Sequence, residues 1–404
     1  MQKIIENISF FEQKVLENFK KQKYIERKIY KDFDNTNFPI FWIVWLRWVW
    51  KTTYLLSKRL KNKKSLYISC DWSFLIWVNL LDLILYYYNN FDINTFYLDE
   101  IQFLPNYAVI LKNIYDIGNI NIVFSGSSKI QLEYLSYDLS RRVVIKKLPI
   151  FSYLEYLNIK HKQNVSWFSF DDLLKNYKQL SFEYSKYYSK DVWKNEYLEY
   201  GEFGYFYQWF KDNFKFLLWN TLKKSIYEDI PQIAVLDAKN LSKLEKMIFY
   251  IANMGASEIS INSLSKKINL DNKITKLYIE YLEKLWWVYS IEKFWKLTEN
   301  IRKEIKIYLS SNNLMYYLSL DKSSNFAWKI RETLFLQNIK KLDLDIFYKK
   351  RTDFVIKYNW KDYEFEIWWK NKKRTDNVFI VKDDILLSEE NTIPLWLFTF
   401  LEKK

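Results

Sequence analysis

The sequence contains very little glycine for its length. An average protein is about 7% glycine, so a chain of 404 residues should carry roughly 28, yet this one has 5. Tryptophan departs in the opposite direction with 18 residues, and the two counts together, 23, are close to an ordinary glycine content. We therefore hypothesise that most tryptophans are glycines in the native protein, as expected if UGA, which some bacterial lineages read as glycine, was translated as tryptophan. The alternative is a tryptophan-rich protein with aromatic anchors at apolar periodic positions.

Cysteine, histidine and long apolar runs are also scarce. The single Cys70 excludes a disulfide framework and fits a reducing cytoplasm. No run of about eighteen apolar residues is present, and the amphipathic, charged N-terminus differs from a signal peptide. The only histidine, His161, is expected on the surface. We therefore expect a soluble cytoplasmic protein without a membrane segment.

Acidic residues are outnumbered by basic ones. The chain has 62 Lys and Arg against 48 Asp and Glu, a net charge of +14. A basic protein gains affinity for nucleic acids by neutralising phosphates. However, only nine of the basic residues are Arg, and the abundance of Ile, Asn, Tyr and Phe is what an AT-rich coding bias produces. Charge alone therefore leaves nucleic-acid binding open.

Short apolar runs alternate with helical patterns between residues 34 and 155. This alternation is the βαβ rhythm of a parallel sheet, so an α/β domain is predicted after an N-terminal helical segment at 1–33. The predicted strands are 38–44, 65–71, 94–100, 119–126 and 142–148.

Three further segments are predicted after this domain. Residues 156–235 are rich in Tyr and show no strand signal, which favours a helical lid. Residues 236–310 contain three helical patterns and a hairpin, with the alternation of a wing at 286–297, which is the order of a winged helix-turn-helix. Residues 320–404 predict a small α/β domain that closes with a strand at 393–401. The lysines of the third helix, Lys273, Lys276 and Lys284, are either a DNA-contacting face or a solvated one.

Several tryptophans occupy places where glycine is physically demanded. Trp286 and Trp287 lie between a predicted helix and the hairpin, and Trp360 follows Asn359 between two alternating runs. Asn-Gly at that place would be a strong hairpin signal, because a type I′ turn needs φ > 0 at both central residues. A random excess of tryptophan would not fall at such positions.

The stretch "WLRWVWKTT" at 45–53 carries the first chemical motif. With glycine restored it begins G-L-R-G-V-G-K-T, placed after a predicted strand and before a predicted helix. In such a loop, glycines let backbone N–H groups approach the β-phosphate, Lys51 reaches the β/γ oxygens and the Thr52 hydroxyl ligates Mg²⁺. The predicted nucleotide-binding residues are Trp45, Arg47, Trp48, Val49, Trp50, Lys51, Thr52 and Thr53.

Candidate catalytic residues follow the next strands. Asp99 and Glu100 end the strand of "FYLDEIQ", where Asp99 would hold Mg²⁺ through water and Glu100 would activate the attacking water. Ser125 or Ser127 in "VFSGSSK" could sense the γ-phosphate, and Arg142 could stabilise charge in cis or across a subunit interface. The structural alternatives are a polar strand end, an ordinary Ser-Gly-Ser turn and an arginine beside a strand.

The successive landmarks resemble a known family. They are "WLRWVWKTTYLL", "YLDEIQFLPNYAVILKNIYD", "IVFSGSSKIQLEYL", "RRVVIKKLPIFSYLEYL", "YIEYLEKLWWVYSI", "FAWKIRETLFLQNI" and "EIWWKNKKRTDNVFIVKDDI". From about residue 25 to the end, the chain is similar to AAA-type prokaryotic ATPases that carry a winged helix and a C-terminal domain related to restriction endonucleases. The resemblance implies a P-loop NTPase fold with ATP binding and hydrolysis, and these relatives have glycine where this chain has tryptophan. It implies no cellular role.

The C-terminal segment departs from the endonuclease pattern. A nuclease core needs an acid on one strand and Glu-x-Lys on the next, because carboxylates bind Mg²⁺ and the lysine supports the attacking water. Asp353 and Glu366 supply acids, but the lysine position holds Trp368, and Lys370 lies two residues further on. A degenerate substrate-binding or partner-binding domain is therefore favoured over an active nuclease.

Three functional interpretations remain. The leading one is an ATP- and Mg²⁺-dependent ATPase acting as a switch or motor, with a protein partner or DNA bound through the winged helix and C-terminal domain and with oligomers allowed. The second is a nucleic-acid-binding protein. The third is a nucleotide-dead scaffold, which follows if the tryptophans are genuine.

Overall fold

The computed structural model forms two compact units, Met1–Pro149 and Ile150–Lys404. The residues that it describes are 2–22, 24–36, 38–126, 139, 141–208, 211–232, 234, 236–253, 261–294, 305–320, 324–349, 352–367 and 378–403. In this described part, no helix is long and apolar enough to cross a membrane.

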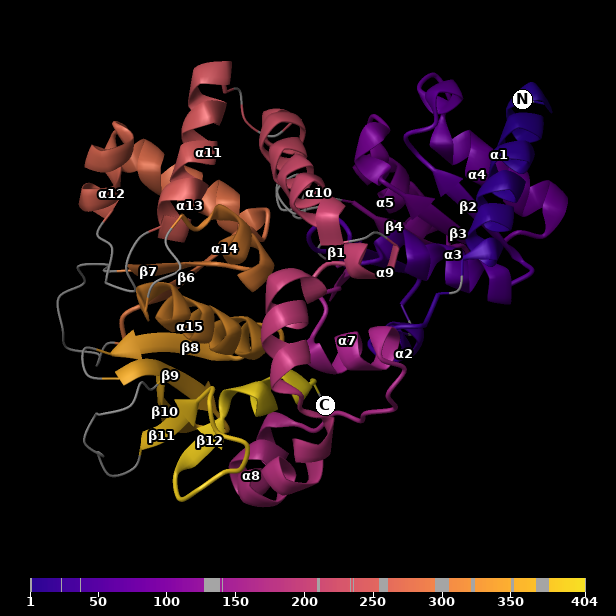
Figure 1. Ribbon diagram of the computed structural model, residues 1–404. Coiled ribbons are helices and arrows are strands. Elements are labelled where there is room, and N and C mark those ends of the chain that lie inside the picture. The colour runs from indigo at the N-terminus through magenta and orange to yellow at the C-terminus, as the bar shows by residue number, and fades with distance from the viewer. Residues whose placement is uncertain are drawn as a thin grey trace. The chain divides into compact units, whose positions relative to one another are not determined.

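Unit 1 is built on a five-stranded parallel sheet with the order β2-β3-β4-β1-β5 (Figure 1). Its strands are β1 (Ile40–Val44), β2 (Ser65–Ser69), β3 (Thr95–Asp99), β4 (Asn121–Ser125) and β5 (Val144–Lys147). Each lies within a predicted strand, so the α/β prediction is confirmed. Every residue of β1 and β3 is buried, and a sheet covered on both faces explains why these strands read as continuous apolar runs.

Helices cover the sheet of unit 1. They are α1 (Gln2–Lys21), α2 (Tyr30–Asp34), α3 (Lys51–Lys61), α4 (Leu80–Phe91) and α5 (Tyr107–Ile117), with short 3₁₀ turns η1 (Ser73–Leu75) and η2 (Ile101–Phe103). The core joins apolar side chains of the central strands, such as Ile40, Phe96 and Ile122, to those of α4 and α5, such as Leu83 and Leu111. Because the strands are parallel, their carboxyl ends lie together at one edge of the sheet. The loops that lead to α3 and η2 begin at this edge.

Unit 2 begins with a helical region and continues with three helices and a two-stranded sheet. The helical elements of the first region are α7 (Tyr153–Lys160), α8 (Phe170–Tyr184), η3 (Ser185–Tyr187), the π-helix η4 (Val192–Gly201), α9 (Tyr205–Gln208), α10 (Lys211–Lys224), η5 (Ser225–Asp229) and η6 (Ile230–Gln232). They are followed by α11 (Ala238–Asn253), α12 (Ile261–Ile268), α13 (Asn272–Lys284), β6 (Val288–Glu292) and β7 (Ile305–Leu309). The predicted helical character of 156–235 is confirmed, whereas its role as a lid stays a prediction.

The stretch at 286–297, which has the alternation of a wing, contributes one strand, β6, to the antiparallel pair within 236–310. β6 pairs antiparallel with β7, which begins only at Ile305. After β6 the chain does not turn back at once, because Lys293 bridges to Tyr348 and the Phe294 amide donates to the Tyr348 carbonyl at 2.8 Å. Three helices and two strands are thus present in the expected order, and a winged-helix function stays a prediction.

A mixed five-stranded sheet forms the C-terminal part of unit 2 (Figure 1). Its strands are β8 (Asp345–Lys349), β9 (Thr352–Tyr358), β10 (Lys361–Ile367), β11 (Val378–Lys382) and β12 (Thr392–Pro394), accompanied by helices α14 (Asn312–Leu318) and α15 (Ser324–Lys340). β8, β9 and β10 pair antiparallel, and β10, β11 and β12 pair parallel. The core joins Phe335 of α15 to Phe354, Phe365 and Phe398 by ring contacts of 4.9 to 5.2 Å.

The predicted closing strand at 393–401 is only partly formed. β12 ends at Pro394, and Leu395–Phe400 form the 3₁₀ helix η7. All six residues of η7 are buried, so no face of this segment is left for solvent. An apolar run buried on every side carries no period that separates a strand from a helix, which explains the wrong prediction.

A buried carboxylate connects the helices of unit 2. Glu202, after η4, is fully buried and accepts hydrogen bonds from Ser311 Oγ at 2.6 Å, the Asn313 amide at 3.1 Å and Gln337 Nε2 at 2.8 Å. Burial raises the pKa of Glu202, and these hydrogen bonds oppose that rise. Because a buried polar group without partners is costly, Glu202 fixes the places of α14 and α15 within the unit.

Within the described ranges, five tryptophans have the backbone conformation that favours glycine. Their φ angles are 154° at Trp45, 64° at Trp48, 70° at Trp50, 64° at Trp286 and 63° at Trp360. Trp286 directly follows the end of α13, and the next amide, at position 287, donates back to the Leu282 carbonyl, as in a glycine-terminated helix. Trp287 itself is fully buried and is not among the positive-φ residues. These positions have glycine-like geometry, and recoding stays a hypothesis about the gene.

The turn at Trp360 generates a stability prediction. Trp360 is fully exposed and follows Asn359, which has φ 49°, so the side chain contributes little packing and its backbone is strained. We expect Trp360→Gly to raise the stability of unit 2 by roughly 1 kcal/mol, because a bulky residue in the left-handed region costs about 1–2 kcal/mol. Circular dichroism during urea unfolding of the full chain measures this change.

A matched control for Trp360→Gly is Trp167→Gly in the same unit. Trp167 is 40% exposed and is not among the positive-φ residues. Glycine there removes packing and increases the entropy of the unfolded chain, so stability should fall. Equal changes in the two variants would contradict the strain argument.

Candidate functional site

Two side chains of unit 1 form hydrogen bonds with the loop between β1 and α3. Arg27, 1% exposed, donates from Nη1 to the carbonyls of Val49 and Pro149, both at 2.9 Å. The Tyr30 hydroxyl donates to the Trp50 carbonyl at 2.8 Å. Sequence reasoning did not single out either residue, since both lie before the motif and no spacing connects them to it.

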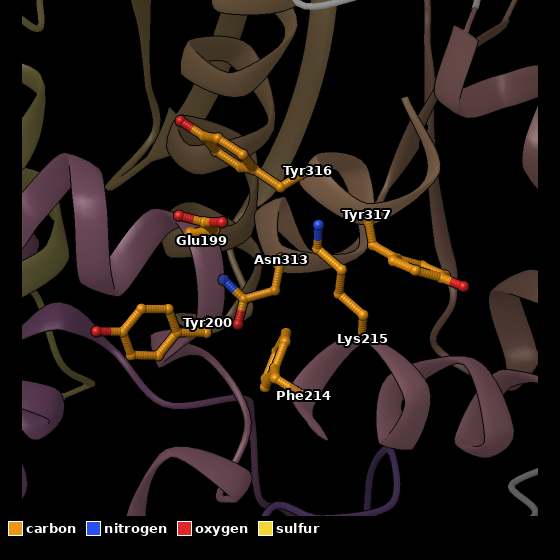
Figure 2. Close-up of a pocket in the computed structure, with 7 residues that line it drawn as sticks. All are labelled: Glu199, Tyr200, Phe214, Lys215, Asn313, Tyr316 and Tyr317. Atoms are coloured by element: carbon orange, nitrogen blue, oxygen red, sulfur yellow. The ribbon is translucent and has the colours of Figure 1, made fainter. Parts of the chain in front are cut away.

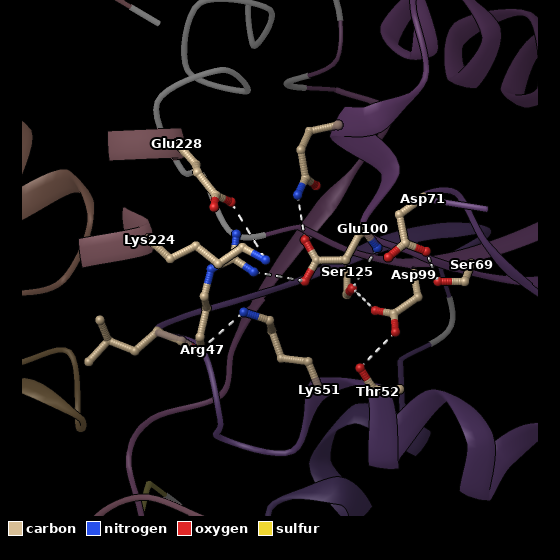
Figure 3. A network of polar contacts seen from close by, with 12 residues as sticks. Arg47, Lys51, Thr52, Ser69, Asp71, Asp99, Glu100, Ser125, Lys224 and Glu228 are labelled. Atoms are coloured by element: carbon tan, nitrogen blue, oxygen red, sulfur yellow. Dashed lines mark hydrogen bonds and ion pairs between the residues drawn. The ribbon is translucent and has the colours of Figure 1, made fainter. Parts of the chain in front are cut away.

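Lys51 folds back over this loop. It is buried, and its ammonium donates to the carbonyls of Trp45 at 2.8 Å and Leu46 at 3.1 Å (Figure 3). The lysine thus lies across the loop whose backbone N–H groups would meet phosphates, as its position in the motif predicts. Thr52 and Thr53 follow in the first turn of α3.

Asp99, at the end of β3, receives three hydroxyl donors. Thr52 Oγ1 donates to its Oδ2 at 2.6 Å and the Tyr67 hydroxyl to the same oxygen at 3.0 Å. Ser125 Oγ, at the end of β4, donates to Oδ1 (Figure 3). Burial raises the pKa of Asp99, the charge of Glu100 raises it further, and the three hydrogen bonds oppose both effects. The structure therefore brings the predicted Thr52, Asp99 and Ser125 together and adds Tyr67.

Glu100 lies beside Asp99 in a left-handed conformation, with φ 51°. Its carboxylate accepts a hydrogen bond from Gln102 Nε2 and lies 3.8 Å from Arg47 Nη1 (Figure 3). Its amide donates to Ser125 Oγ at 3.1 Å. Ser125 thus connects both acids, and Arg47 of the phosphate loop contacts the candidate base.

Thr52 and Asp99 fit a magnesium ion. A hydroxyl and a carboxylate are the oxygen ligands that Mg²⁺ prefers, and this ion usually binds one or two carboxylates together with substrate phosphates and water. Among the described residues no group of three or more His, Cys, Asp or Glu side chains could hold a metal.

Arg142 lies where the amino ends of the parallel strands meet, opposite the carboxyl ends that carry the loop after β1. It precedes β5, which runs parallel to β1, whereas the phosphate loop follows β1. Its Nε is 3.3 Å from Asp116 Oδ1 at the end of α5. The sheet topology contradicts the predicted role in cis, because Arg142 and the loop after β1 lie at opposite ends of parallel strands. A role across a subunit interface stays a prediction. Ser127 lies outside the described residues.

The two acids predicted in the C-terminal sheet, Asp353 and Glu366, have structural surroundings within that sheet. Asp353 Oδ2 accepts the Ile367 amide at 2.9 Å, and Glu366 is buried. A residue that sequence reasoning missed, Glu332 of α15, is buried near Asp353, and burial together with the charge of Asp353 raises its pKa to about 7. Trp368 and Lys370 lie outside the described residues, so the lysine of the nuclease pattern stays untested.

Comparisons with known proteins match two separate parts of the chain. Residues 37–157 match a family model described as an AAA domain, and residues 193–325 match a domain of unknown function. An uncharacterized protein of Methanocaldococcus jannaschii is 27% identical over 317 residues, covering 72% of this chain and 66% of that protein. An uncharacterized protein of Haemophilus influenzae is 24% identical over 305 residues, covering 72% of this chain and 70% of that protein. The match thus spans slightly less than two thirds of the first relative.

A solved structure is similar at a much lower level. It is a signal-transduction ATPase with numerous domains (STAND) with a tetratricopeptide repeat sensor, from Pyrococcus horikoshii. The similarity has a TM-score of 0.29 and 9% identity, and covers 79% of this chain and 46% of that chain.

The parallel sheet, the loop after β1 and the match to the AAA model agree on one part of the chain. Residues 37–157 match the model of an AAA domain, and the same stretch contains the five-stranded parallel sheet of a P-loop NTPase fold.

Proposed function

We propose that unit 1 binds ATP with Mg²⁺ and hydrolyses it, and that the chain works as an ATP-driven switch or motor. The observation that carries this proposal is the meeting of Thr52, Asp99 and Ser125 at one edge of the sheet. Thr52 comes from α3, Asp99 from β3 and Ser125 from β4, and both hydroxyls donate to the one buried carboxylate. A polar strand end without a function would not require donors from two other elements.

Binding of the phosphates is assigned to the loop at 45–53. Lys51 would exchange the carbonyls of Trp45 and Leu46 for phosphate oxygens, because a charge-assisted contact with an anion is stronger than one with a neutral carbonyl. The start of α3 adds backbone N–H groups and the positive end of the helix dipole. Arg47, Val49 and Thr53 complete the proposed nucleotide-binding set.

Thr52 and Asp99 would hold Mg²⁺, which when bound supplies positive charge that neutralises the phosphates. Tyr67 and Ser125 keep the Asp99 carboxylate oriented through their hydroxyls. Glu100 would accept the proton of the attacking water, and for this its carboxylate must exchange contacts with Arg47 and Gln102. Arg142 enters this proposal only as a residue supplied to a neighbouring subunit of an oligomer.

We further propose that positions 45, 48 and 50 are glycine in the native protein. The support is the positive φ at all three positions and the burial of Trp45 and Trp50, at 3% and 7% exposure, inside the loop that must receive phosphates. UGA codons at these positions in the coding DNA would support recoding, and UGG codons would overturn it. With genuine tryptophans the scaffold interpretation becomes the better one.

Replacing the three loop tryptophans together should restore ATP binding. The three tryptophans belong to the loop whose backbone N–H groups would approach a phosphate, and each positive φ costs a bulky residue about 1–2 kcal/mol. We expect the variant with Trp45→Gly, Trp48→Gly and Trp50→Gly to bind ATP at least tenfold more tightly than the chain as written, measured by isothermal titration calorimetry with Mg²⁺. Trp72→Gly, outside the loop, is the control. Equal affinities of the triple variant and the parent would refute the phosphate-loop assignment.

Two substitutions in this glycine background should separate binding from hydrolysis. Glu100→Gln keeps the shape of the side chain but removes the base, so ATP should still bind while turnover falls by about 10²–10⁴. Lys51→Ala should weaken ATP binding itself, whereas Lys61→Ala, at the exposed end of the same helix, should not. Calorimetry and phosphate release measure the two quantities. Unchanged turnover in Glu100→Gln would place the base elsewhere.

A second candidate function, DNA binding by unit 2, is favoured by the surface of α12 and α13. Lys266, Lys267, Lys273 and Lys276 are all exposed there, and the helices precede a two-stranded sheet as in a winged helix. If this surface binds DNA, duplex affinity should fall steeply between 50 and 200 mM salt, and Lys273→Gln with Lys276→Gln should flatten that dependence, because fewer counterions are released. Fluorescence anisotropy with a labelled duplex tests this. Absence of binding at low salt would leave a protein partner as the candidate for unit 2.

A further inference from the structure

One ion pair joins the loop at 45–53 to the candidate base. Arg47 is the only arginine of this loop, and its Nη1 lies 3.8 Å from Oε1 of Glu100, which follows β3 (Figure 3). The two side chains are 15% and 20% exposed, so water screens their attraction less than it screens an ion pair on the surface. A change in the contacts of Arg47 therefore affects Glu100.

The carboxylate of Glu100 has a protein contact at each oxygen. Gln102 Nε2 donates to Oε2, and the guanidinium of Arg47 faces Oε1. The backbone of Glu100 is held as well, because its amide donates to Ser125 Oγ at 3.1 Å. A general base needs a carboxylate oxygen that can accept a proton from water. The exchange of a contact at the carboxylate therefore decides when Glu100 can act.

The contact with Arg47 is the easier one to exchange. Its separation of 3.8 Å exceeds the length of an N–H···O hydrogen bond, about 2.7–3.2 Å, so it is a charge attraction without a hydrogen bond. Gln102, in contrast, donates a hydrogen bond to the carboxylate. A guanidinium binds phosphate oxygens through two parallel charge-assisted hydrogen bonds. A phosphate within reach of Arg47 would therefore compete successfully with Glu100.

The γ-phosphate of ATP comes within that reach if Glu100 is the base. A general base lies within about 3.2 Å of the water whose proton it accepts, and this water attacks the γ-phosphate. A side chain that contacts Glu100 therefore borders the place of attack. Because the arginine side chain has several rotatable bonds, a change of rotamer is enough to move its guanidinium from one anion to the other. ADP has no γ-phosphate, so with ADP this exchange does not occur.

A cavity of about 320 Å³ in unit 2, lined from η4, α10 and α14, is a less suitable place for a nucleotide (Figure 2). Among the described residues that line it are one lysine, Lys215, and one carboxylate, Glu199. Their charges offset each other, whereas a triphosphate is attracted by a site with an excess of cations. The loop at 45–53 contains Arg47 and Lys51 and no acidic residue. The charges of the two places therefore favour the loop.

We propose that Arg47 discriminates ATP from ADP by exchanging its contact with Glu100 for the γ-phosphate. This inference rests on the proposed ATPase function of unit 1. With ADP the ion pair stays closed, and Glu100 keeps the contacts at both oxygens. With ATP the guanidinium moves to the γ-phosphate, and Oε1 of Glu100 can accept a hydrogen bond from water. The base then becomes available only while the nucleotide on which it acts is bound.

Calorimetric titration of the full chain with glycine at positions 45, 48 and 50 tests this exchange. ADP and β,γ-imido-ATP, which is not hydrolysed, are titrated in the presence of Mg²⁺. Arg47→Gln should weaken the triphosphate by about tenfold or more and change ADP by less than about threefold, because a charge-assisted hydrogen bond is lost only with the triphosphate. Arg47→Lys keeps the charge but not the planar fork, so it should weaken the triphosphate less than Arg47→Gln does.

Arg59→Gln is the matched control. Arg59 lies in the same unit, is 21% exposed and pairs with Glu12 at 2.6 Å, but it belongs to the last turn of α3 and not to the loop. Its replacement should leave the ratio of the two affinities unchanged, and circular dichroism confirms that each variant is folded. A ratio in Arg47→Gln equal to that of the parent would overturn the exchange, whether both affinities fall or neither does. Failure of both nucleotides to bind the parent would overturn the proposed function itself, on which the exchange rests.

Discussion

The Asp99 carboxylate is the group on which the arrangement of unit 1 depends. It is buried at the carboxyl edge of the sheet, where an ionised group is stable only if it is hydrogen-bonded. Thr52, Tyr67 and Ser125 meet this requirement from α3, β2 and β4. One buried acid therefore aligns the loop after β1 with the ends of three strands, and the candidate base Glu100 follows it directly in the chain.

Unit 2 also contains a buried carboxylate that is stabilised by hydrogen bonds. Glu202 is buried and accepts hydrogen bonds from donors of the α14 and α15 regions. Asn313 contributes to this network through its backbone amide, and its side chain accepts the Glu202 amide. The buried carboxylate thus holds α14 and α15 in place within the unit.

The sequence predicted the helices and strands more accurately than the contacts between them. Strong apolar runs followed by turn residues located all five strands of unit 1, and the Lys-Thr and Asp-Glu pairs located the two halves of the candidate site. The errors arose at positions where the local sequence pattern carries no information about tertiary contacts. The run at 393–401 is buried on all sides and has no period that separates a strand from a helix. Arg142 lies at the amino end of β5, because β5 runs parallel to β1.

The sequence by itself determined the local features: a candidate phosphate loop with its lysine and threonine, an acidic pair after a strand, and tryptophans at positions where the backbone has positive φ. These are local properties, because a motif and a backbone conformation depend on neighbours within a few residues. Only the tertiary structure decided that Tyr67 and Gln102 join the candidate site, that Arg27 supports the loop from 22 residues away, and that Ser311 and Gln337 meet at Glu202. Such contacts join residues far apart in the chain, and no periodicity or spacing in the sequence records them.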